Sequence, residues 1–445
     1  MTCFQINRKL LIMKIHYFIG IGGYAPFSPF MTTIAKQRGY SAFIVGLMFT
    51  LLPIPLLITT PIMTAMTDKY KCRRLVFIAS SVLIFAFTCL LAIIPGTTSK
   101  EIDDLDVIMS PLFWLFFISN AMIGICGRLK SCLDDTICMS LLGEDKHLYG
   151  KQRLWGSIGW SLMAILSGAC VDWYSKGQEY KNYTPGYIIA LILFLLDIYV
   201  ITKIEITQES DNSTVVSDVK HLLVKGKILA FLLWVVFIGF FMSFIWNYVF
   251  WYLEDLSNIY HPETLSWIKT LQGLALIVQC FGGEVPSFFL SSYVIKHVDH
   301  MNTFSITFLA FTVIFSSYSF ITNPLWTLPI EVLNGVSYAL SFSVAISYAA
   351  NVSPVGAEGT LQGVVGTALT GIGSPLGSLI GGYMFKTIGS IASFKILSVV
   401  AFTTCITQII VNQLIVRWSK NGHIKDKEYS KVETKDIAED ITTTI

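Results

Sequence analysis

The chain has 445 residues, of which 53% are apolar or aromatic and only 13% are charged, about half the charged share of an average soluble domain. This composition excludes a soluble globular protein, and the formal net charge of +2 gives no sign of a nucleic-acid partner. Apolar runs of about 18 residues or more recur along the chain, and each is long enough to cross the bilayer as a helix. The sequence therefore predicts a multi-pass integral membrane protein.

Twelve apolar segments are predicted to span the membrane. In the N-terminal part they cover residues 10–34, 43–66, 75–95, 110–142, 154–173 and 186–204. In the C-terminal part they cover residues 227–253, 264–290, 302–321, 325–351, 359–385 and 391–418. The segment 110–142 is too long for one perpendicular crossing, so we expect it to tilt or to extend into water. Because many spans follow the first, we expect that segment to be a retained helix and not a cleaved signal peptide.

Lysine and arginine residues predict the orientation. If both termini face the cytosol, the cytosolic segments carry 21 of the 31 basic residues, the outer loops carry 7, and 3 lie within spans. Cytosolic loops of membrane proteins carry the excess of basic residues, so both termini are predicted to be cytosolic. Asn182 of the sequence NYT then lies outside and is predicted to carry a glycan. The plasma membrane and the internal membranes stay open as alternatives.

A polar stretch divides the spans into two sets of six. Residues 1–203 are predicted to form an N-terminal six-helix bundle, 204–226 a cytosolic linker, 227–418 a C-terminal six-helix bundle and 419–445 a disordered cytosolic tail. Two six-helix halves are a common plan of transporters, with the solute path between the halves. The nine cysteines are scattered, so neither a disulfide framework nor a metal site is predicted.

The loop between the second and third spans has the sequence TAMTDKYKCRRL. It resembles the loop signature of the major facilitator superfamily, in which an aspartate and basic residues follow a glycine-rich start. The matching residues are Asp68, Lys69, Arg73 and Arg74, while Thr64 and Lys71 stand where the family usually has glycine. The resemblance implies that the four matching residues form a gating loop whose contacts break in one of two conformations. The alternative is that their charges only fix the topology.

Three further segments resemble a narrower branch, the major facilitator superfamily domain-containing protein 6-like proteins. They are LYGKQRLWGSIGW (148–160), FWYLEDL (250–256) and LQGVVGTALTGIGSPLGSLIGG (361–382). That branch is related to proton-linked carriers of oligosaccharides and nucleosides. The resemblance covers nearly all twelve spans and implies an all-α membrane protein with twelve transmembrane helices in two six-helix bundles.

Charged residues interrupt the fourth predicted span. A charge at the centre of a lone membrane helix costs about 2.5–3.5 kcal/mol, so these side chains must face protein, water or one another. Asn120, Arg128 and Asp135 share one helical face, which predicts them as a wall of the solute cavity. Lys130 and Asp134 are an i,i+4 pair on another side and are expected to neutralise each other. The alternative for Asp135 is a cap at the wet end of the helix.

Two glutamates interrupt the spans of the second half. Glu284 lies in the eighth span beside two glycines and a proline, where a broken helix could expose backbone groups. Glu331 begins a polar stripe down one face of the tenth span, which Asn334 and Tyr338 continue. A buried carboxylate without a fixed cation resists ionisation, so either glutamate is a candidate proton site on the transport pathway. The alternative is a neutral, hydrogen-bonded glutamate with a structural role.

Aromatic residues crowd the seventh span, and most are expected to pack in the core or to face lipid. Trp246 and Asn247 are adjacent in this span and are candidates to stack on, and hydrogen-bond, a sugar or a base. In the first span, glycine and proline residues predict a bend. His16 of the first span is expected to be a surface histidine near the inner interface.

Together these features predict a monomeric secondary transporter of a small polar solute that works by alternating access in the lipid bilayer. Protons are the expected coupling ion, and no other cofactor is predicted. Sugars, nucleosides and organic anions fit the polar and aromatic residues alike. A second hypothesis is that a transport-inactive carrier fold serves as a surface receptor or scaffold through the loop 96–109. A membrane enzyme is disfavoured, because the sequence offers no paired His/Glu or His/Cys cluster.

Overall fold

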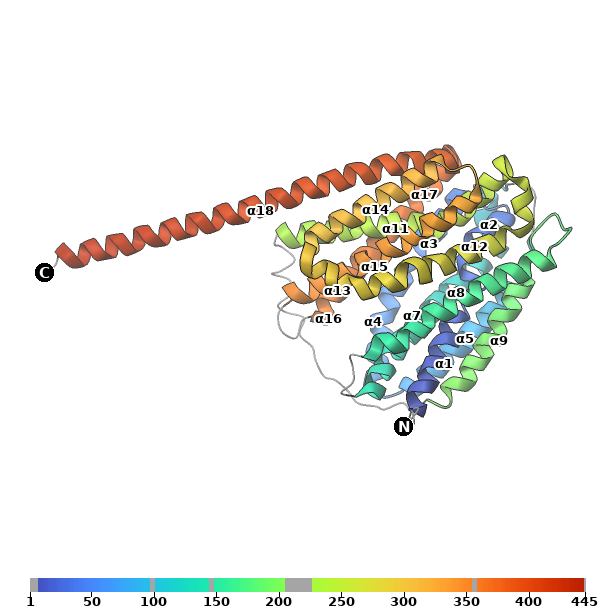
Figure 1. The fold of residues 1–445 in the computed structure, drawn as a ribbon. Helices are drawn as coiled ribbons and strands as arrows, with labels where there is room; N and C mark the ends of the chain where they lie inside the picture. The colour runs from blue at the N-terminus through green and yellow to red at the C-terminus, as the bar shows by residue number, and fades with distance from the viewer. Residues whose placement is uncertain (1–6, 97–100, 144–147, 205–225, 354–357, 444–445) are drawn as a thin grey trace, which may run out of the picture.

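The structure is a computed structural model that describes residues 7–96, 101–143, 148–204, 226–353 and 358–443. These residues form helices joined by turns and short loops, with no strand among them. The helices up to residue 201 form one bundle, and the helices from Gly226 onward form a second bundle that packs against it (Figure 1). This is the two-bundle membrane architecture that the sequence predicts. Residues 205–225 of the predicted linker lie outside the described residues.

The N-terminal bundle is drawn in blue to green in Figure 1. It consists of α1 (Arg8–Gly22), α2 (Met31–Gln37), α3 (Ala42–Leu51), α4 (Pro53–Lys69), α5 (Arg73–Ile93), α6 (Asp104–Met109), α7 (Pro111–Leu142), α8 (Tyr149–Tyr174) and α9 (Thr184–Ile201). A 3₁₀ turn, Ser28–Phe30, precedes α2. The long fourth span is thus one unbroken helix, α7, as its sequence predicts.

The C-terminal bundle is drawn in yellow-green to red in Figure 1. It consists of α11 (Gly226–Tyr260), α12 (Ile268–Ile277), α13 (Val285–Val298), α14 (His300–Phe320), α15 (Thr327–Val352), α16 (Glu358–Gly366), α17 (Ser374–Thr387) and α18 (Ser390–Thr443). Two π-helical segments, Val278–Glu284 and Thr367–Gly373, connect α12 to α13 and α16 to α17. The 3₁₀ turns Pro262–Trp267 and Pro324–Trp326 precede α12 and α15.

The first predicted span differs from the others because its helix is broken. Eleven helical segments of the described chain are long and apolar enough to cross a membrane, and residues 10–34 are not among them. Instead α1 ends at Gly22, and a turn and the short helix α2 continue the path. Pro26 lacks a backbone N–H, and Pro29 opens the 3₁₀ turn, so the sequence itself interrupts the helix. The first crossing is therefore made by two short helices in series.

The last helix is longer than the sequence predicts. The predicted span ends at residue 418 with a disordered tail after it, whereas α18 continues to Thr443 and extends away from the bundle (Figure 1). The segment after Gly422 contains neither glycine nor proline and is rich in lysine, glutamate and isoleucine. Because no residue there breaks a helix, the backbone continues in helical geometry.

Glycine residues bring the backbones of the two bundles into direct contact. The bundles pack through two helix pairs, α8 against α12 and α3 against α17. A Cβ added at Gly168 or Gly273 would lie 2.2 Å or 2.5 Å from backbone atoms of the opposing helix in the first pair. At the second pair, a Cβ at Gly46 or Gly382 would lie 2.5 Å or 2.4 Å from the opposing backbone. Any side chain at these positions would push the halves apart.

Candidate functional site

A cavity with a volume of about 480 Å³ lies between the two bundles. We call it the central cavity, and helices of both bundles line it. Its polar and aromatic lining residues are Ser28, Thr32, Phe49, Arg153, Ser157 and Trp160 from the N-terminal bundle, and Trp246, Asn247, Phe250, Gln279, Cys280, Glu284, Glu331 and Tyr338 from the C-terminal bundle. The structure therefore brings five of the nine residues predicted for the pathway into one cavity, namely Trp246, Asn247, Glu284, Glu331 and Tyr338.

Arg153 and Glu284 place opposite charges on opposite sides of the central cavity. Arg153 lies in α8 of the N-terminal bundle, and Glu284 ends the π-helical segment of the C-terminal bundle. Their charges act on each other across the cavity, although no ion pair joins them. Within the described part of the chain, neither side chain makes a hydrogen bond, and the guanidinium of Arg153 lies 5.8 Å from the ring centroid of Tyr17. The cavity thus contains one guanidinium group and one carboxyl group that make no hydrogen bond to the described residues and can contact a solute.

The π-helical segment explains how Glu284 reaches the central cavity. The sequence predicts a break beside Glu284, and residues 278–284 indeed leave α-helical geometry without ending the helix. Gly283 lets this wider segment lie against α15, because a Cβ there would lie 2.2 Å from the carbonyl oxygen of Val332. Local π-helical turns shift side chains around the helix axis and are frequent at functional sites. Here Gln279, Cys280 and Glu284 all line the cavity.

Glu331 has a different environment from Glu284. Its carboxylate accepts a hydrogen bond of 2.6 Å from the Tyr318 hydroxyl and one of 2.7 Å from Asn334 Nδ2. The residue is 3% exposed, although it touches the edge of the cavity. Asn334 is also buried, and its side chain donates to Glu331 and does not line the cavity. These two donors favour the structural alternative for Glu331.

Two predicted pathway residues lie near the central cavity in a small neighbouring pocket. Asn120 and Asn247 both line this pocket, which has a volume of about 230 Å³. Asn247 Nδ2 donates hydrogen bonds to Ser243 Oγ and Ser378 Oγ, which leaves its carbonyl oxygen for a solute. Asn120 Nδ2 donates to the Phe116 carbonyl oxygen of its own helix. The pair Trp246 and Tyr338 adds a T-shaped aromatic contact with ring centroids 6.0 Å apart.

The structure does not bring Arg128 or Asp135 into the central cavity. Arg128 is exposed on α7, and Asp135 is half-buried and accepts hydrogen bonds from the hydroxyls of Tyr149 at 2.7 Å and Tyr17 at 3.3 Å. The expectation that these two residues form a cavity wall is therefore corrected. The bundle turns the opposite face of α7, with Lys130 and Asp134, toward α1 and α9.

His16 is buried, in contrast to the surface position expected for it. We call His16, Lys130, Asp134 and Asp197 the His16 cluster. Nδ1 of His16 is 2.7 Å from Asp197 Oδ1, and Nε2 is 2.7 Å from Asp134 Oδ1. Lys130 Nζ is 3.0 Å from Asp197 Oδ2 and 4.0 Å from Asp134 Oδ2, so the predicted pair with Asp134 is the weaker of its two contacts. Sequence reasoning missed Asp197, although an acid within an apolar helix was a signal that could have found it.

The predicted gating loop connects α4 to α5. Lys69 ends α4 with its amine 5.7 Å from the Tyr70 ring centroid, and an Arg74 amine is 3.4 Å from the Thr202 carbonyl oxygen. Arg73 begins α5, and the side chain of Asp68 lies outside the described residues. Lys71 has a φ of 51°, in the left-handed region that favours glycine. This conformation explains why the family signature has glycine at a position where this chain has lysine.

Ion pairs and hydrogen bonds join the two bundles at one end. We call it the outer end, because the charge distribution predicts that it faces outward; it lies at the upper right of Figure 1. Lys36 of α2 contacts Asp255 and Glu254 of α11 at 2.6 Å and 3.5 Å. The other contacts are Thr33 with Lys269 at 2.8 Å, Asp172 with Thr270 Oγ1 at 2.7 Å, Lys181 with the Ser266 carbonyl at 2.9 Å, and Asp104 with Lys386. We call this set the outer closure.

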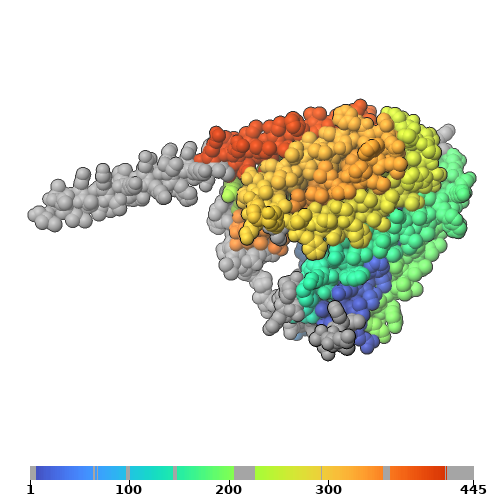
Figure 2. All heavy atoms as spheres, viewed as in Figure 1, coloured from blue at the N-terminus to red at the C-terminus, as the bar shows by residue number. Residues whose placement is uncertain are grey.

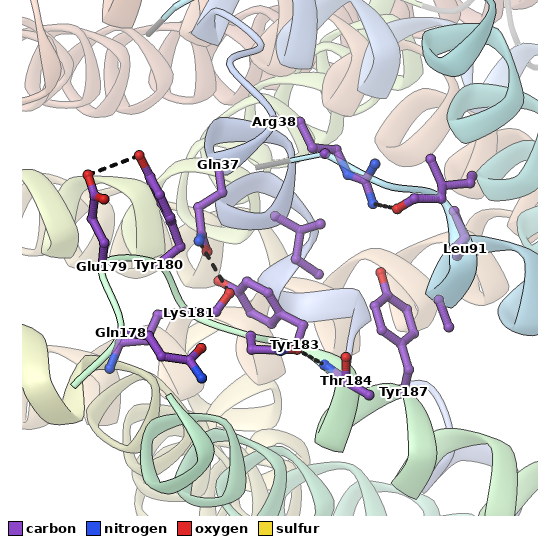
Figure 3. A pocket seen from close by; sticks show the side chains of 15 residues that line it. Gln37, Arg38, Leu91, Gln178, Glu179, Tyr180, Lys181, Tyr183, Thr184 and Tyr187 are labelled. Carbon is purple, nitrogen blue, oxygen red and sulfur yellow. Dashed lines mark hydrogen bonds between the residues drawn. The ribbon is translucent and has the colours of Figure 1, made fainter. Parts of the chain in front are cut away.

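A second sizeable pocket opens at the outer end of the N-terminal bundle alone (Figure 3). Its volume is about 330 Å³, and it lies between α2, the end of α5 and the residues before α9, among them Asn182. Arg38 on its wall donates hydrogen bonds to the carbonyls of Ile94 and Pro95 and stacks 4.8 Å from the Phe116 ring. Burial lowers the pKa of the Arg38 guanidinium. Arg38, a charged group of this pocket, is thus already bound to backbone carbonyls and an aromatic ring of its own bundle. The central cavity is therefore a better candidate for a solute site than this pocket.

The sequence matches the model of the MFS_1 like family over residues 10–396. The chain belongs to this family. A curated relative, major facilitator superfamily domain-containing protein 6-like protein B of Xenopus laevis, is 24% identical over 346 residues, which are 75% of this chain and 53% of that protein. The chain thus spans about half the length of this relative. The family confirms the resemblance that the loop motif and the three longer segments indicate.

Solved structures with the same fold are transporters. A crystal structure of the nucleoside transporter NupG has a TM-score of 0.74 at 12% identity, with 91% of this chain and 98% of that chain covered. A structure described as showing substrate recognition in proton dependent oligopeptide transporters has a TM-score of 0.66 at 12% identity and covers 92% and 99%. At this identity the likeness establishes the fold, which is that of multi-pass membrane transporters.

Arg153 is the charged cavity residue that sequence reasoning missed. Because Arg153 lies near the start of the fifth predicted span, it counts among the 21 cytosolic basic residues that predict the topology. That position gives no indication that its side chain lines a cavity. One signal was available: Arg153, Ser157 and Trp160 recur at spacings of four and three and therefore share one helical face. That face lines the cavity in the structure.

Proposed function

We propose that this protein is a secondary transporter that carries a small polar solute by alternating access, with protons as the coupling ion. The observation that supports this most directly is the central cavity between the bundles, with Arg153 of one half facing Glu284 of the other. A solute held by both residues links the two halves. Its binding energy can therefore favour one arrangement of the halves over another.

The state of the two ends supports alternating access. The outer closure joins the halves at the outer end. In Figure 2 the yellow and orange C-terminal half separates from the teal N-terminal half toward the opposite end, where Figure 1 places α4 and α16. This arrangement corresponds to an inward-facing state if both termini are cytosolic, as we propose. A glycan on Asn182, detected as a mobility shift that Asn182→Gln abolishes, would support that orientation.

The lining of the cavity supports a solute with hydrogen-bonding groups and a planar face. Trp160, Trp246 and Tyr338 offer aromatic surface, and Asn247 and Gln279 offer amide groups between the two charges. The structures with this fold include a nucleoside transporter and proton dependent oligopeptide transporters. Nucleosides, sugars and short peptides are therefore the solute classes that we propose to test first.

The test is an uptake measurement in cells that express the chain, with labelled uridine, sucrose, glycyl-sarcosine and succinate as solutes. We expect one solute to accumulate above the level of cells without the protein, and to accumulate more when the outside is acidic. Accumulation of none of them by protein that is present at the cell surface would contradict the proposal for these classes. That outcome would favour the alternative of a receptor or scaffold, which binding of a partner to the loop 96–109 would then test.

A further inference from the structure

The His16 cluster lies inside the N-terminal bundle, apart from the central cavity. Its members come from three helices: His16 from α1, Lys130 and Asp134 from α7, and Asp197 from α9. His16 is 0% exposed, and Lys130, Asp134 and Asp197 are 4%, 5% and 1% exposed. A buried group of four ionisable side chains is costly in a membrane protein and is therefore a candidate for function.

The hydrogen bonds of His16 require an additional proton. A carboxylate accepts hydrogen bonds and donates none, so each ring nitrogen must carry a hydrogen for both 2.7 Å contacts to form. A neutral imidazole carries only one N–H. Both bonds therefore form only when His16 is an imidazolium ion, or when Asp134 or Asp197 is protonated. In either case the cluster holds one proton more than a neutral histidine between two carboxylates.

The same proton balances the charge of the cluster. With it, His16 and Lys130 together offset the charges of Asp134 and Asp197. Without it, one negative charge is left in the interior of the bundle, and one of the two short hydrogen bonds is lost. The protonated and deprotonated clusters therefore favour different packing of α1 against α7 and α9.

The groups around His16 allow little freedom. On α5 the Phe77 ring lies 5.4 Å from the imidazole centroid, and on α1 the Tyr17 ring lies at 6.1 Å. A Cβ at Gly20 would lie 2.7 Å from Lys130 Nζ, so α1 approaches the lysine as closely as a glycine allows. The other titratable groups near the cluster are Tyr24 after α1, Cys126, Cys132, Asp135 and Cys138 on α7, and Tyr149 and Arg153 on α8. The charges that contact the imidazole are those of Asp134 and Asp197.

Helix α1 connects the His16 cluster to the central cavity. Ile21, five residues after His16, lines the cavity, and so do Ser28 and Pro29 beyond the break. A second connection passes through Tyr17, whose ring faces the Arg153 guanidinium and whose hydroxyl donates to Asp135. A change in the position of α1 would therefore move both a wall of the cavity and the surroundings of its cation.

We infer that the His16 cluster is a proton-binding site and that its exchangeable proton drives solute transport. The proton is bound between Asp134 and Asp197 through the ring of His16, and its release shifts α1 and the cavity that α1 lines. The role in transport rests on the proposed function. The exchange of the proton does not, because it involves no solute.

The first test measures the protonation of His16 directly in the full-length protein in lipid nanodiscs. The chain has seven histidines, and replacing the six others with glutamine leaves His16 as the only imidazole. With ¹⁵N-labelled histidine, NMR distinguishes two N–H groups from one. We expect two at about pH 6 and one at about pH 10. Ring ¹⁵N signals that do not change at all across this range would overturn the inference, because a proton held on His16, Asp134 or Asp197 would then be fixed or absent.

A second variant asks whether the carboxylates hold the proton. Asp197→Asn in the same background removes one charge while keeping the shape of the side chain. We expect His16 to lose its second N–H at a pH lower by about one unit or more, because an opposite charge next to the ring is gone. An unchanged titration would show that the cluster does not act as a unit and would overturn the assignment.

A third measurement connects the proton to transport. His16→Gln and the control His300→Gln are reconstituted in proteoliposomes. The transported probe is uridine, or another of the four solutes of the uptake test if the wild type takes that solute up faster. His300 lies in the other bundle, where its ring is 3.0 Å from Ser347 Oγ. We expect His16→Gln to exchange solute across the membrane as the wild type does, but its accumulation of solute under a pH gradient should be at least tenfold lower. His300→Gln should retain both exchange and accumulation. Wild-type accumulation by His16→Gln would overturn the coupling role. If the wild type moves no solute, the proposed function fails, and the NMR result still decides whether the proton exchanges.

Discussion

Lys36 Nζ lies 2.6 Å from Asp255 Oδ1, and this ion pair joins the N-terminal bundle to the C-terminal bundle at the outer end. Both side chains are about a quarter exposed, at 25% and 27%, so water screens the attraction only in part. Glu254, next to Asp255, also contacts Lys36 and pairs with the buried Lys269 of its own half. Since Lys269 in turn donates to Thr33, charges from both halves form one connected network. Separation of the halves at this end must break it.

The first prediction is that weakening this network opens the outer end more often. Asp255→Asn removes a partly exposed ion pair worth up to about 1 kcal/mol, which corresponds to a shift of the conformational equilibrium of up to roughly fivefold. The measurement uses a variant in which Ser28→Cys supplies the only cysteine, because Ser28 is exposed and lines the central cavity. We expect a membrane-impermeant thiol reagent added outside to modify this cysteine faster, by up to about fivefold, when Asp255→Asn is also present.

Glu263→Gln is the matched control for this prediction. Glu263 is also an acid near the outer end, but its partner is His261 of the same half, at 2.7 Å. Its removal should leave the labelling rate unchanged. Equal acceleration by both variants would indicate a general effect of surface charge, and no acceleration by Asp255→Asn would show that the pair does not hold the halves together.

The second prediction separates two arginines. Arg153→Ala removes the only cation among the residues that line the central cavity as the structure describes it, and we expect uptake of the transported solute to fall at least tenfold. A hydrogen bond to a charged group contributes about 1.5–3 kcal/mol, which is roughly 10- to 150-fold in affinity. Arg128→Ala changes an exposed arginine outside the cavity, and we expect uptake within about twofold of the wild type. The readout is initial uptake rate as a function of solute concentration, normalised to protein at the cell surface.

The opposite ranking would restore the role that the sequence alone indicates for Arg128. The helical face that contains Asn120 and Arg128 does reach the small pocket beside the cavity, but through Asn120 and Gly124 and not through Arg128. A large loss of uptake in Arg128→Ala together with near-normal uptake in Arg153→Ala would mean that the solute binds along α7 and not between Arg153 and Glu284.

Composition and hydropathy were sufficient to predict the fold, because each membrane crossing is recorded locally as an apolar run. The polar stretch after residue 204 was sufficient to divide the chain into two halves. The glutamates and Trp246 and Asn247 were found because a polar residue in an apolar span is conspicuous. These four residues and the predicted Tyr338 share the central cavity in the structure.

The partners of the buried charges could not be predicted from the sequence. His16 and Asp197 are separated by 181 positions, and only the packing of α1 on α9 brings them within 2.7 Å. In the same way, Lys36, Lys181 and Lys386 counted only as outer charges for the topology, whereas the structure pairs each with a group on the opposite bundle. Periodicity identifies a helical face but not the helix that covers it. This is why Arg128 is exposed instead of lining the cavity, and why Lys130 lies closer to Asp197 than to its predicted partner Asp134.

The third prediction concerns the stability contributed by Glu331. Glu331→Leu leaves the Tyr318 hydroxyl and the Asn334 amide buried without their acceptor, at a cost of about 1–3 kcal/mol for each group. We expect a clear decrease in the melting temperature of the purified protein. Glu331→Gln keeps an oxygen that accepts from one of the two donors, so we expect a smaller decrease. A melting temperature unchanged in Glu331→Leu would mean that the carboxylate does not hold these groups, and would reopen its role as a proton site.

The fourth prediction tests the glycine contacts between the halves. In Gly46→Ala the new Cβ would lie 2.5 Å from the carbonyl oxygen of Ser378 on the facing helix, so α3 and α17 must separate. Overpacking of this kind costs about 1–3 kcal/mol, and here the cost falls on the contact between the bundles. We expect a lower melting temperature and a slower uptake rate, because the arrangement with the outer end closed depends on this contact. Gly150→Ala is the matched control, since no heavy atom of the described residues beyond its own helical turn lies within 4 Å of its added Cβ, and an alanine in the first turn of α8 should not destabilise the helix. Equal effects of the two substitutions would indicate that the loss of glycine flexibility, and not the contact between the halves, controls the transport cycle.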